Sequence, residues 1–153
     1  MAINIQIGVS GSRKTLVRLK AMGVELNDFS DEFGQMGTEL VDFFSGPVFD
    51  TEGGITGARW ANLKPEYEWL KRRMWPGRGI LEASGQLRRS FRYFASKTLL
   101  KIDNVRMPLF AFHQRGTIKM PARAMFRFNN TLLERIFIII KDGLKRKIQR
   151  AMK

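Results

Sequence analysis

Hydrophobic residues near the N-terminus alternate with polar ones. Ile3, Ile5, Ile7 and Val9 fall on one face of an extended chain. A period of two is typical of a half-buried β-strand. We therefore predict an N-terminal strand within residues 1–10, followed by a turn at Ser10-Gly11-Ser12. The basic stretch at 15–22 is compatible with either a helical turn or a strand.

The apolar spacing changes between Val24 and Phe44, where apolar residues recur every three or four positions. They are Leu26, Phe29, Phe33, Met36, Leu40 and Phe43. This spacing predicts an amphipathic helix with its acidic residues on the opposite face. Gly34 and Gly37 weaken such a helix by about 1 kcal/mol each relative to alanine. We expect them to mark a close contact of the helix.

The middle of the chain is divided by glycine and proline. Residues 45–57 are predicted to form a flexible glycine-rich loop. Residues 64–74 are expected to be helical, with Tyr67, Leu70 and Met74 on one face, and Trp75-Pro76-Gly77 ends this helix. A helical turn is expected at 86–91, strand structure that can form a hairpin at 93–102, and a loop at 108–123.

The last predicted element is a basic amphipathic helix. Thr131-Leu132-Leu133-Glu134 matches a capping box. The residues expected to face inward are Leu133, Phe137, Ile140, Leu144 and Ile148. The β-branched run Ile136–Ile140 would also suit a strand, but the capping box and the length favour a helix. Together these elements predict one α+β domain over residues 1–153, with a small antiparallel or mixed sheet, a long acidic N-terminal helix and a basic C-terminal helix.

Composition narrows the functional classes. The 153 residues suit a single domain. The absence of cysteine excludes disulfides, cysteine-ligated zinc and a thiol nucleophile. The N-terminus does not resemble a signal peptide. The longest apolar run, Ile136–Ile140, is far shorter than the roughly 20 residues of a spanning helix, so we expect no membrane partner.

The residue types that carry catalysis are sparse. His113 is the single histidine, and no Gly-x-Ser-x-Gly motif supplies a serine nucleophile. Asp28, Asp31 and Glu32 share a helical face but lack further metal ligands at a known spacing. No dinucleotide, kinase or zinc motif is present. We therefore predict no enzymatic activity, no catalytic or metal residues and no cofactor. His113 is interpreted as structural, and the clusters Lys71-Arg72-Arg73 and Arg88-Arg89 as solvated faces.

Three blocks of sequence resemble the phage virion-morphogenesis or tail-completion family of Mu-like and related tailed phages. The first is Gly57-Ala58-Arg59-Trp60-Ala61-Asn62-Leu63, and the second runs from Ile80 to Ser90. The third is His113-Gln114-Arg115-Gly116 with Met120-Pro121-Ala122-Arg123-Ala124-Met125-Phe126. The resemblance covers roughly residues 24–150. It assigns family-motif or assembly roles to Trp60, Leu63, Leu81, Gly85, Leu87, His113, Gln114, Gly116, Pro121, Ala122, Arg123 and Phe126.

The resemblance implies a structural protein of the virion, assembled in the host cytoplasm. Such proteins are similar to neck components that form rings, often sixfold, and that complete the tail and allow it to join the head. The implied partners are further copies of this chain, with a hexamer as the expected form, and neighbouring neck, head-closure and tail-terminator proteins. DNA passing through the lumen is a further candidate partner. The alternative is a basic nucleic-acid-binding protein that acts by charge.

Charge is distributed unevenly along the chain. The net charge is +13, yet eight acidic residues and no lysine or arginine lie between Glu25 and Glu52. In a ring, such segregation predicts a head-to-tail interface with one acidic and one basic patch. We assign Asp28, Asp31 and Glu32 to the acidic patch. Lys145, Arg146 and Arg150 are predicted to contact a partner protein, which we favour, or DNA.

Overall fold

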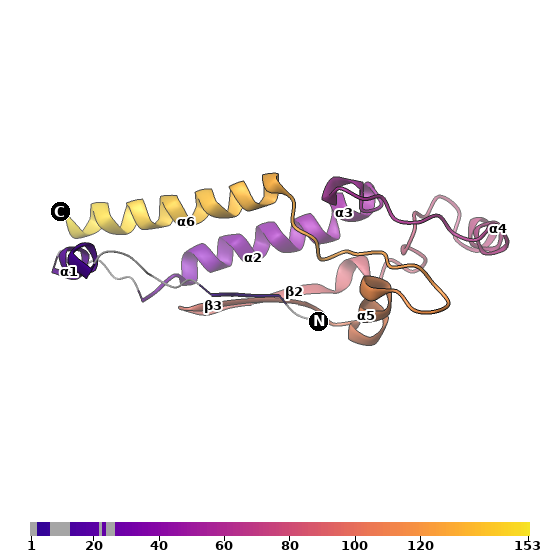
Figure 1. Cartoon of the computed structure of the whole chain (residues 1–153), viewed down its shortest axis with the longest axis horizontal. Helices are drawn as coiled ribbons and strands as arrows, with labels where there is room; N and C mark the ends of the chain where they lie inside the picture. Colours follow the sequence, from indigo (N-terminus) through magenta and orange to yellow (C-terminus); the bar gives the residue numbers. More distant parts are fainter. Residues whose placement is uncertain (1–2, 7–12, 22, 24–26) are drawn as a thin grey trace.

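The computed structural model describes residues 3–6, 13–21, 23 and 27–153. It confirms the predicted α+β class. Helix α2 (Ser30–Ser45) lies on a three-stranded antiparallel sheet formed by β1 (Ile3–Gln6), β2 (Phe91–Ala95) and β3 (Leu99–Asn104). Helix α6 (Asn130–Ala151) covers the side of α2 that faces away from the sheet, as Figure 1 shows. Helix α1 (Arg13–Ala21) lies at one end of this elongated molecule, and α4 (Pro65–Met74) at the other (Figure 1).

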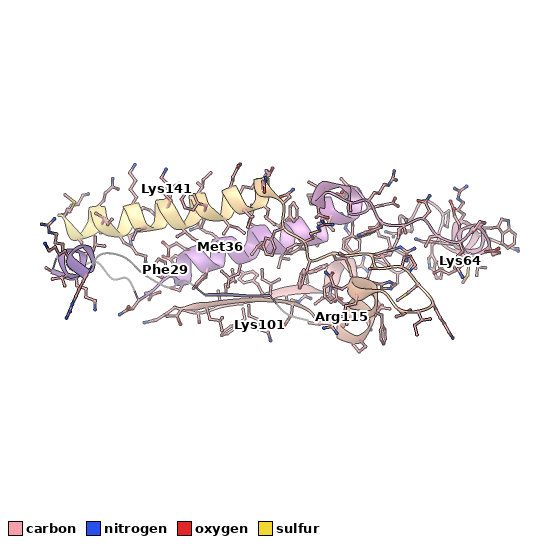
Figure 2. The ribbon with its side chains drawn as sticks, viewed as in Figure 1. Phe29, Met36, Lys64, Lys101, Arg115 and Lys141 are labelled. Carbon is pink, nitrogen blue, oxygen red and sulfur yellow. The ribbon has the colours of Figure 1, made fainter. Side chains whose placement is uncertain are left out.

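The sheet has the order β1-β3-β2, with β3 in the centre. Strands β2 and β3 form the hairpin that the sequence allowed, in a register that pairs Tyr93 with Ile102. Phe91, Leu100 and Ile102 are buried beneath α2, whereas Lys101 lies on the opposite, exposed face (Figure 2). The N-terminal strand is confirmed for Ile3–Gln6, and the rest of that prediction lies outside the described residues.

Helix α2 supplies more buried apolar side chains to the core than any other described element. Phe29 precedes it, and together with Phe33, Met36, Leu40 and Phe43 it is buried, so the predicted stripe is confirmed for every member except Leu26, which lies outside the described residues. Phe44 extends this core into a cluster of aromatic rings. Its ring lies 4.8 Å from that of Phe126 and 6.1 Å from that of Phe91. The cluster joins α2, the sheet and the segment before α6.

One of the two glycines in α2 marks the expected close contact. A Cβ atom on Gly37 would lie 2.3 Å from Cδ2 of Tyr93, so the helix approaches β2 at the distance that glycine allows. Gly34 has open space around it. The two glycines therefore have different roles, although they share one helix.

The acidic side of α2 meets the basic side of α6 within the same chain. Glu32 is 3% exposed, and its carboxylate lies 3.6 Å from the Lys147 ammonium and 3.7 Å from the Arg146 guanidinium. Gly143 makes room for it, because a Cβ there would overlap the Glu32 side chain. At the other end of the contact, Arg135 pairs with Glu39 at 2.7 Å.

These contacts correct the predicted acidic interface. Glu32 is enclosed between two helices of its own subunit and does not face a neighbour. Asp28 lies before α2, where its carboxylate accepts hydrogen bonds from the Ser30 hydroxyl and amide, which lower its pKa. Asp31 is exposed. Of the three acids only Glu32 lies between α2 and α6, so the three do not form one patch.

The buried face of α6 also differs from the prediction. Leu132 and Ile136 are buried, whereas Leu133 and Phe137 are 50% and 65% exposed. The helix begins at Asn130, and its cap is Asn129, two residues before the predicted cap Thr131. The Asn129 carboxamide oxygen accepts a hydrogen bond from the Leu132 amide at 2.8 Å. In the run Ile136–Ile140 every face is apolar, so periodicity could not determine which face points inward.

Two predicted loops contain helical structure. Residues 45–57 form α3 (Pro47–Asp50) and a 3₁₀ turn (Gly54–Thr56), and Val48 and Phe49 are buried in the core. Residues 107–115 form α5 (Met107–Arg115). Both helices have proline in the first turn, where its missing N–H is not needed. Val48 and Phe49 of α3 and Phe110 of α5 are buried in the core, and this packing overrides the glycine and proline signals.

The two glycines of α2 provide a matched test of the packing. Gly37→Ala should lower the free energy of unfolding by about 1–3 kcal/mol, because the new methyl group overpacks the contact with Tyr93. Gly34→Ala should raise it by up to about 1 kcal/mol, because alanine favours the helix and meets no neighbour. Chemical denaturation of both variants measures the difference. Equal effects would contradict the close approach of α2 to β2.

Candidate functional site

The three sequence blocks converge on one end of the domain. They surround a pocket of about 450 Å³ between α4, the segment that precedes β2, and α5. The predicted site residues that line it are Leu63, Leu81, Leu87, His113, Pro121 and Arg123. The other predicted motif residues form the frame behind the pocket. The sequence did not indicate that these blocks lie together, and the structure shows that they do.

Trp60 fastens the first block to the third. Its indole N–H donates to the carbonyl of Ala124 at 2.9 Å, and its ring meets that of Phe49 edge-on at 5.3 Å. Gly53, at φ 83°, lies directly against the indole, where a Cβ would come within 2.5 Å of Nε1. The glycines of the 45–57 segment thus serve close packing around Trp60.

Gln114 holds the backbone of the third block. Its side-chain oxygen accepts hydrogen bonds from the amides of Met125 at 2.7 Å and Phe126 at 3.0 Å, and its nitrogen donates to the Phe126 carbonyl at 3.2 Å. Gly116, at φ 76°, ends α5 where a Cβ would lie 2.7 Å from the amide nitrogen of Ala122. These contacts fold the segment after α5 back upon the helix, and they bring Phe126 into the aromatic core.

Arg123 clamps the third block to the first. Its guanidinium donates to the carbonyl of Ala61, from Nε at 3.1 Å and from Nη2 at 2.9 Å, and to the carbonyl of Asn62 at 3.2 Å. The residue is buried, and burial lowers its pKa from the usual value. The sequence allowed Arg123 to bind carbonyls or a carboxylate. The structure shows that it binds carbonyls of its own chain, so its direct role is to position the pocket wall.

The second block is held by Arg88, which we had assigned to a solvated cluster. Its guanidinium donates to Glu82 and Asp50, each at 2.7 Å, and to the carbonyl of Ser45. The hydrogen bond to Glu82 raises the pKa of Arg88. Gly85 takes the positive φ expected of it, at 69°, and Leu81 also lies at φ 65°. Arg88 therefore ties a strained turn to the end of α2.

Lys71 is the second residue whose role the sequence did not reveal. It is the buried residue of α4, and its ammonium donates to the carbonyl of Gly79 at the edge of the pocket. Burial lowers the pKa of Lys71, while Glu82 and Glu52 oppose this shift. The sequence did not distinguish Lys71 from the other members of the run Lys71-Arg72-Arg73, whose two arginines are exposed.

His113 lies in the wall of the pocket. Burial, and then the positive charge of Arg123, lower the pKa of His113, so the imidazole is neutral at pH 7. Its Nδ1 is buried and makes no hydrogen bond with any described residue. No group of three or more metal-ligating side chains occurs within residues 27–153 or the other described segments. The lining combines apolar side chains (four leucines, Met120 and Pro121) with four basic ones (Lys64, Lys71, Lys119 and Arg123).

Comparison with known proteins decides the family. A sequence model of the phage virion morphogenesis family matches residues 11–145. The chain belongs to the phage virion morphogenesis family. No curated protein and no solved structure matches the chain. As a family member, it has a structural role in building the phage particle. None of the described helices is long and apolar enough to cross a membrane.

The Arg123 clamp makes a stability prediction. Arg123→Ala should lower the free energy of unfolding by about 2–3 kcal/mol, because it removes charge-assisted hydrogen bonds to buried carbonyls. Arg123→Lys should lose much of the same energy, because an ammonium lacks the planar fork that reaches two carbonyls. Arg115→Ala, at an exposed position of α5, is the matched control. Thermal denaturation compares the three, and an Arg123→Ala protein as stable as the control would contradict the clamp.

The lowered pKa of His113 predicts a pH dependence. The free histidine has a pKa near 6.5, so the unfolded chain takes up a proton in acid that the folded chain resists. The free energy of unfolding of the wild type should therefore be highest above this pH, and it should fall as the pH drops below it. The His113→Gln variant should lack this component. Denaturation curves between about pH 7.5 and pH 5 measure it, and parallel curves for the two proteins would contradict the assignment.

Proposed function

We propose that this family member is a tail-completion or neck component that assembles into a ring, with six copies as the expected number. In this role it finishes the tail at its head-proximal end and allows the tail to join the DNA-filled head. DNA then passes through the lumen of the ring. The neighbours above and below would be head-closure and tail-terminator proteins.

The main support for self-assembly is a set of large apolar side chains that are exposed at the surface. Helix α4 extends from the end of the domain, and Trp69 on it is 64% exposed. Three more apolar residues of the same helix, which the sequence placed on one face, are also exposed: Tyr67, Leu70 and Met74. Isolated exposed apolar residues are ordinary, but several on one projecting helix are typical of a protein–protein contact.

The basic charge supports a partner of opposite sign. Lys145, Arg146 and Arg150 are exposed near the end of α6, although Arg146 also lies near Glu32. We favour an acidic neighbouring ring as their partner, because a strongly basic lumen would retain DNA and slow its passage. The same residues suit the alternative function, a nucleic-acid-binding protein that acts by charge.

The two functions predict different behaviour of the purified protein. A neck component should form a defined ring, visible by light scattering and negative-stain imaging. A phage that lacks the protein should accumulate filled heads separate from its tails. A charge-driven DNA binder should instead remain monomeric and bind DNA tightly, with an affinity that falls steeply as salt is raised. Monomers at all concentrations, together with normal head–tail joining in its absence, would contradict the ring proposal.

A further inference from the structure

Helices α4 and α6 carry the same exposed pattern of four residues. In α4 it is Glu66, Trp69, Leu70 and Arg73, and in α6 it is Glu134, Phe137, Ile138 and Lys141. Each set occupies positions i, i+3, i+4 and i+7, which lie on one face of a helix. Both faces thus have an acid at the N-terminal end, two large apolar residues in the middle and a base at the C-terminal end.

All eight side chains are exposed in the single subunit. Phe137 and Ile138 are 65% and 53% exposed, and Lys141 lies on the outer side of α6 (Figure 2). In α4, Trp69 is 64% exposed, and the guanidinium of Arg73 lies 5.7 Å from the centre of its ring. None of the four charged residues forms an ion pair with another described residue of the chain. Each face is therefore available to a partner.

We propose that α4 of one subunit docks antiparallel on the outer face of α6 of a second copy. In this orientation Glu66 meets Lys141, Arg73 meets Glu134, and Trp69 and Leu70 lie on Phe137 and Ile138. A parallel arrangement would place acid against acid and base against base, which is unfavourable. The charges therefore select the direction of docking, and the apolar residues supply the buried area.

The positions of the two helices suit a closed ring. Helix α4 projects from one end of the subunit, whereas α6 lies along the domain above α2 (Figure 1). Each subunit then offers α4 to one neighbour and α6 to the other, which is the head-to-tail geometry that generates rings. This inference rests on the proposed self-assembly, and it assigns that assembly to particular residues. It also replaces the predicted acidic interface at Asp28, Asp31 and Glu32.

Two competing arrangements have the same charge match. Because both patterns run from acid to base, α6 could pair antiparallel with α6 of a second copy, with Glu134 against Lys141, and α4 could pair with α4, with Glu66 against Arg73. Each is a two-fold dimer that uses one of the two helices alone. A test must therefore separate the α4–α6 contact from both of these pairings, and only the α4–α6 contact predicts rescue by a double charge reversal of Arg73 and Glu134.

A charge exchange between Arg73 and Glu134 makes this separation. Arg73→Glu and Glu134→Arg should each raise the concentration needed for assembly by about tenfold or more, because each places like charges in contact. The double variant restores an opposite pair at every interface of a ring, and should return assembly close to that of the wild type. Sedimentation or light scattering at several concentrations measures this. Circular dichroism verifies that the exposed substitutions leave the fold intact.

The apolar centre of the contact has a matched control. Phe137→Ser should abolish or strongly weaken assembly. Phe94→Ser, at a residue of β2 that is 61% exposed, should not. Equal effects of the two substitutions would overturn the α6 assignment.

The outcomes of the charge exchange distinguish failure of the docking of α4 on α6 from failure of the proposed ring. Assembly of the wild type that is unaffected by either single reversal would overturn the docking of α4 on α6 and leave the ring intact. Loss of assembly with Glu134→Arg alone, without rescue by the double variant, would overturn it in favour of α6–α6 pairing. A wild-type protein that stays monomeric would overturn both the docking and the proposed function.

Discussion

Helix α2 is buried on two sides at once, and most of the fold depends on this placement. Its apolar stripe packs on the sheet, at a distance that Gly37 keeps short. Its other side meets α6, where Glu32 is enclosed with Lys147 and Arg146. A buried carboxylate is costly unless it is paired, so loss of Lys147 and Arg146 would leave an uncompensated charge between the two helices. The acidic character of α2 and the basic character of α6 therefore serve cohesion within the subunit.

Around this centre, side chains that bind backbone atoms connect segments far apart in sequence. Trp60, Gln114 and Arg123 all bind backbone groups, and Arg88 binds the end of α2 as well as two carboxylates. Loops held in this way keep one conformation without forming regular structure, because their polar backbone groups have specific partners. The family-motif residues thus shape a rigid end of the domain, from which α4 projects.

Two features of the subunit surface suit contact with another molecule. Exposed apolar residues are concentrated on α4 and on the outer face of α6, and unpaired charges stand at both ends of each patch. In such a contact the apolar centre supplies the buried area, and the charges at its edge fix the relative orientation of the two helices. Raised salt should slow the formation of such an assembly more than it weakens the assembled state.

The sequence by itself determined the α+β class, the strand structure at 93–102 and the stripe of α2. Each of these rests on local spacing or on a motif, such as the recurrence from Phe29 to Phe43. It did not determine the inward face of α6, because the run Ile136–Ile140 is apolar on all sides. It also predicted that Lys71 and Arg88 face solvent, because a cluster of basic residues does not indicate which of its members binds a buried partner. Glu32 shows the same limit: only the packing of α2 against α6 decided that this acid binds its own chain rather than a neighbour, because pairing depends on which helices meet in space.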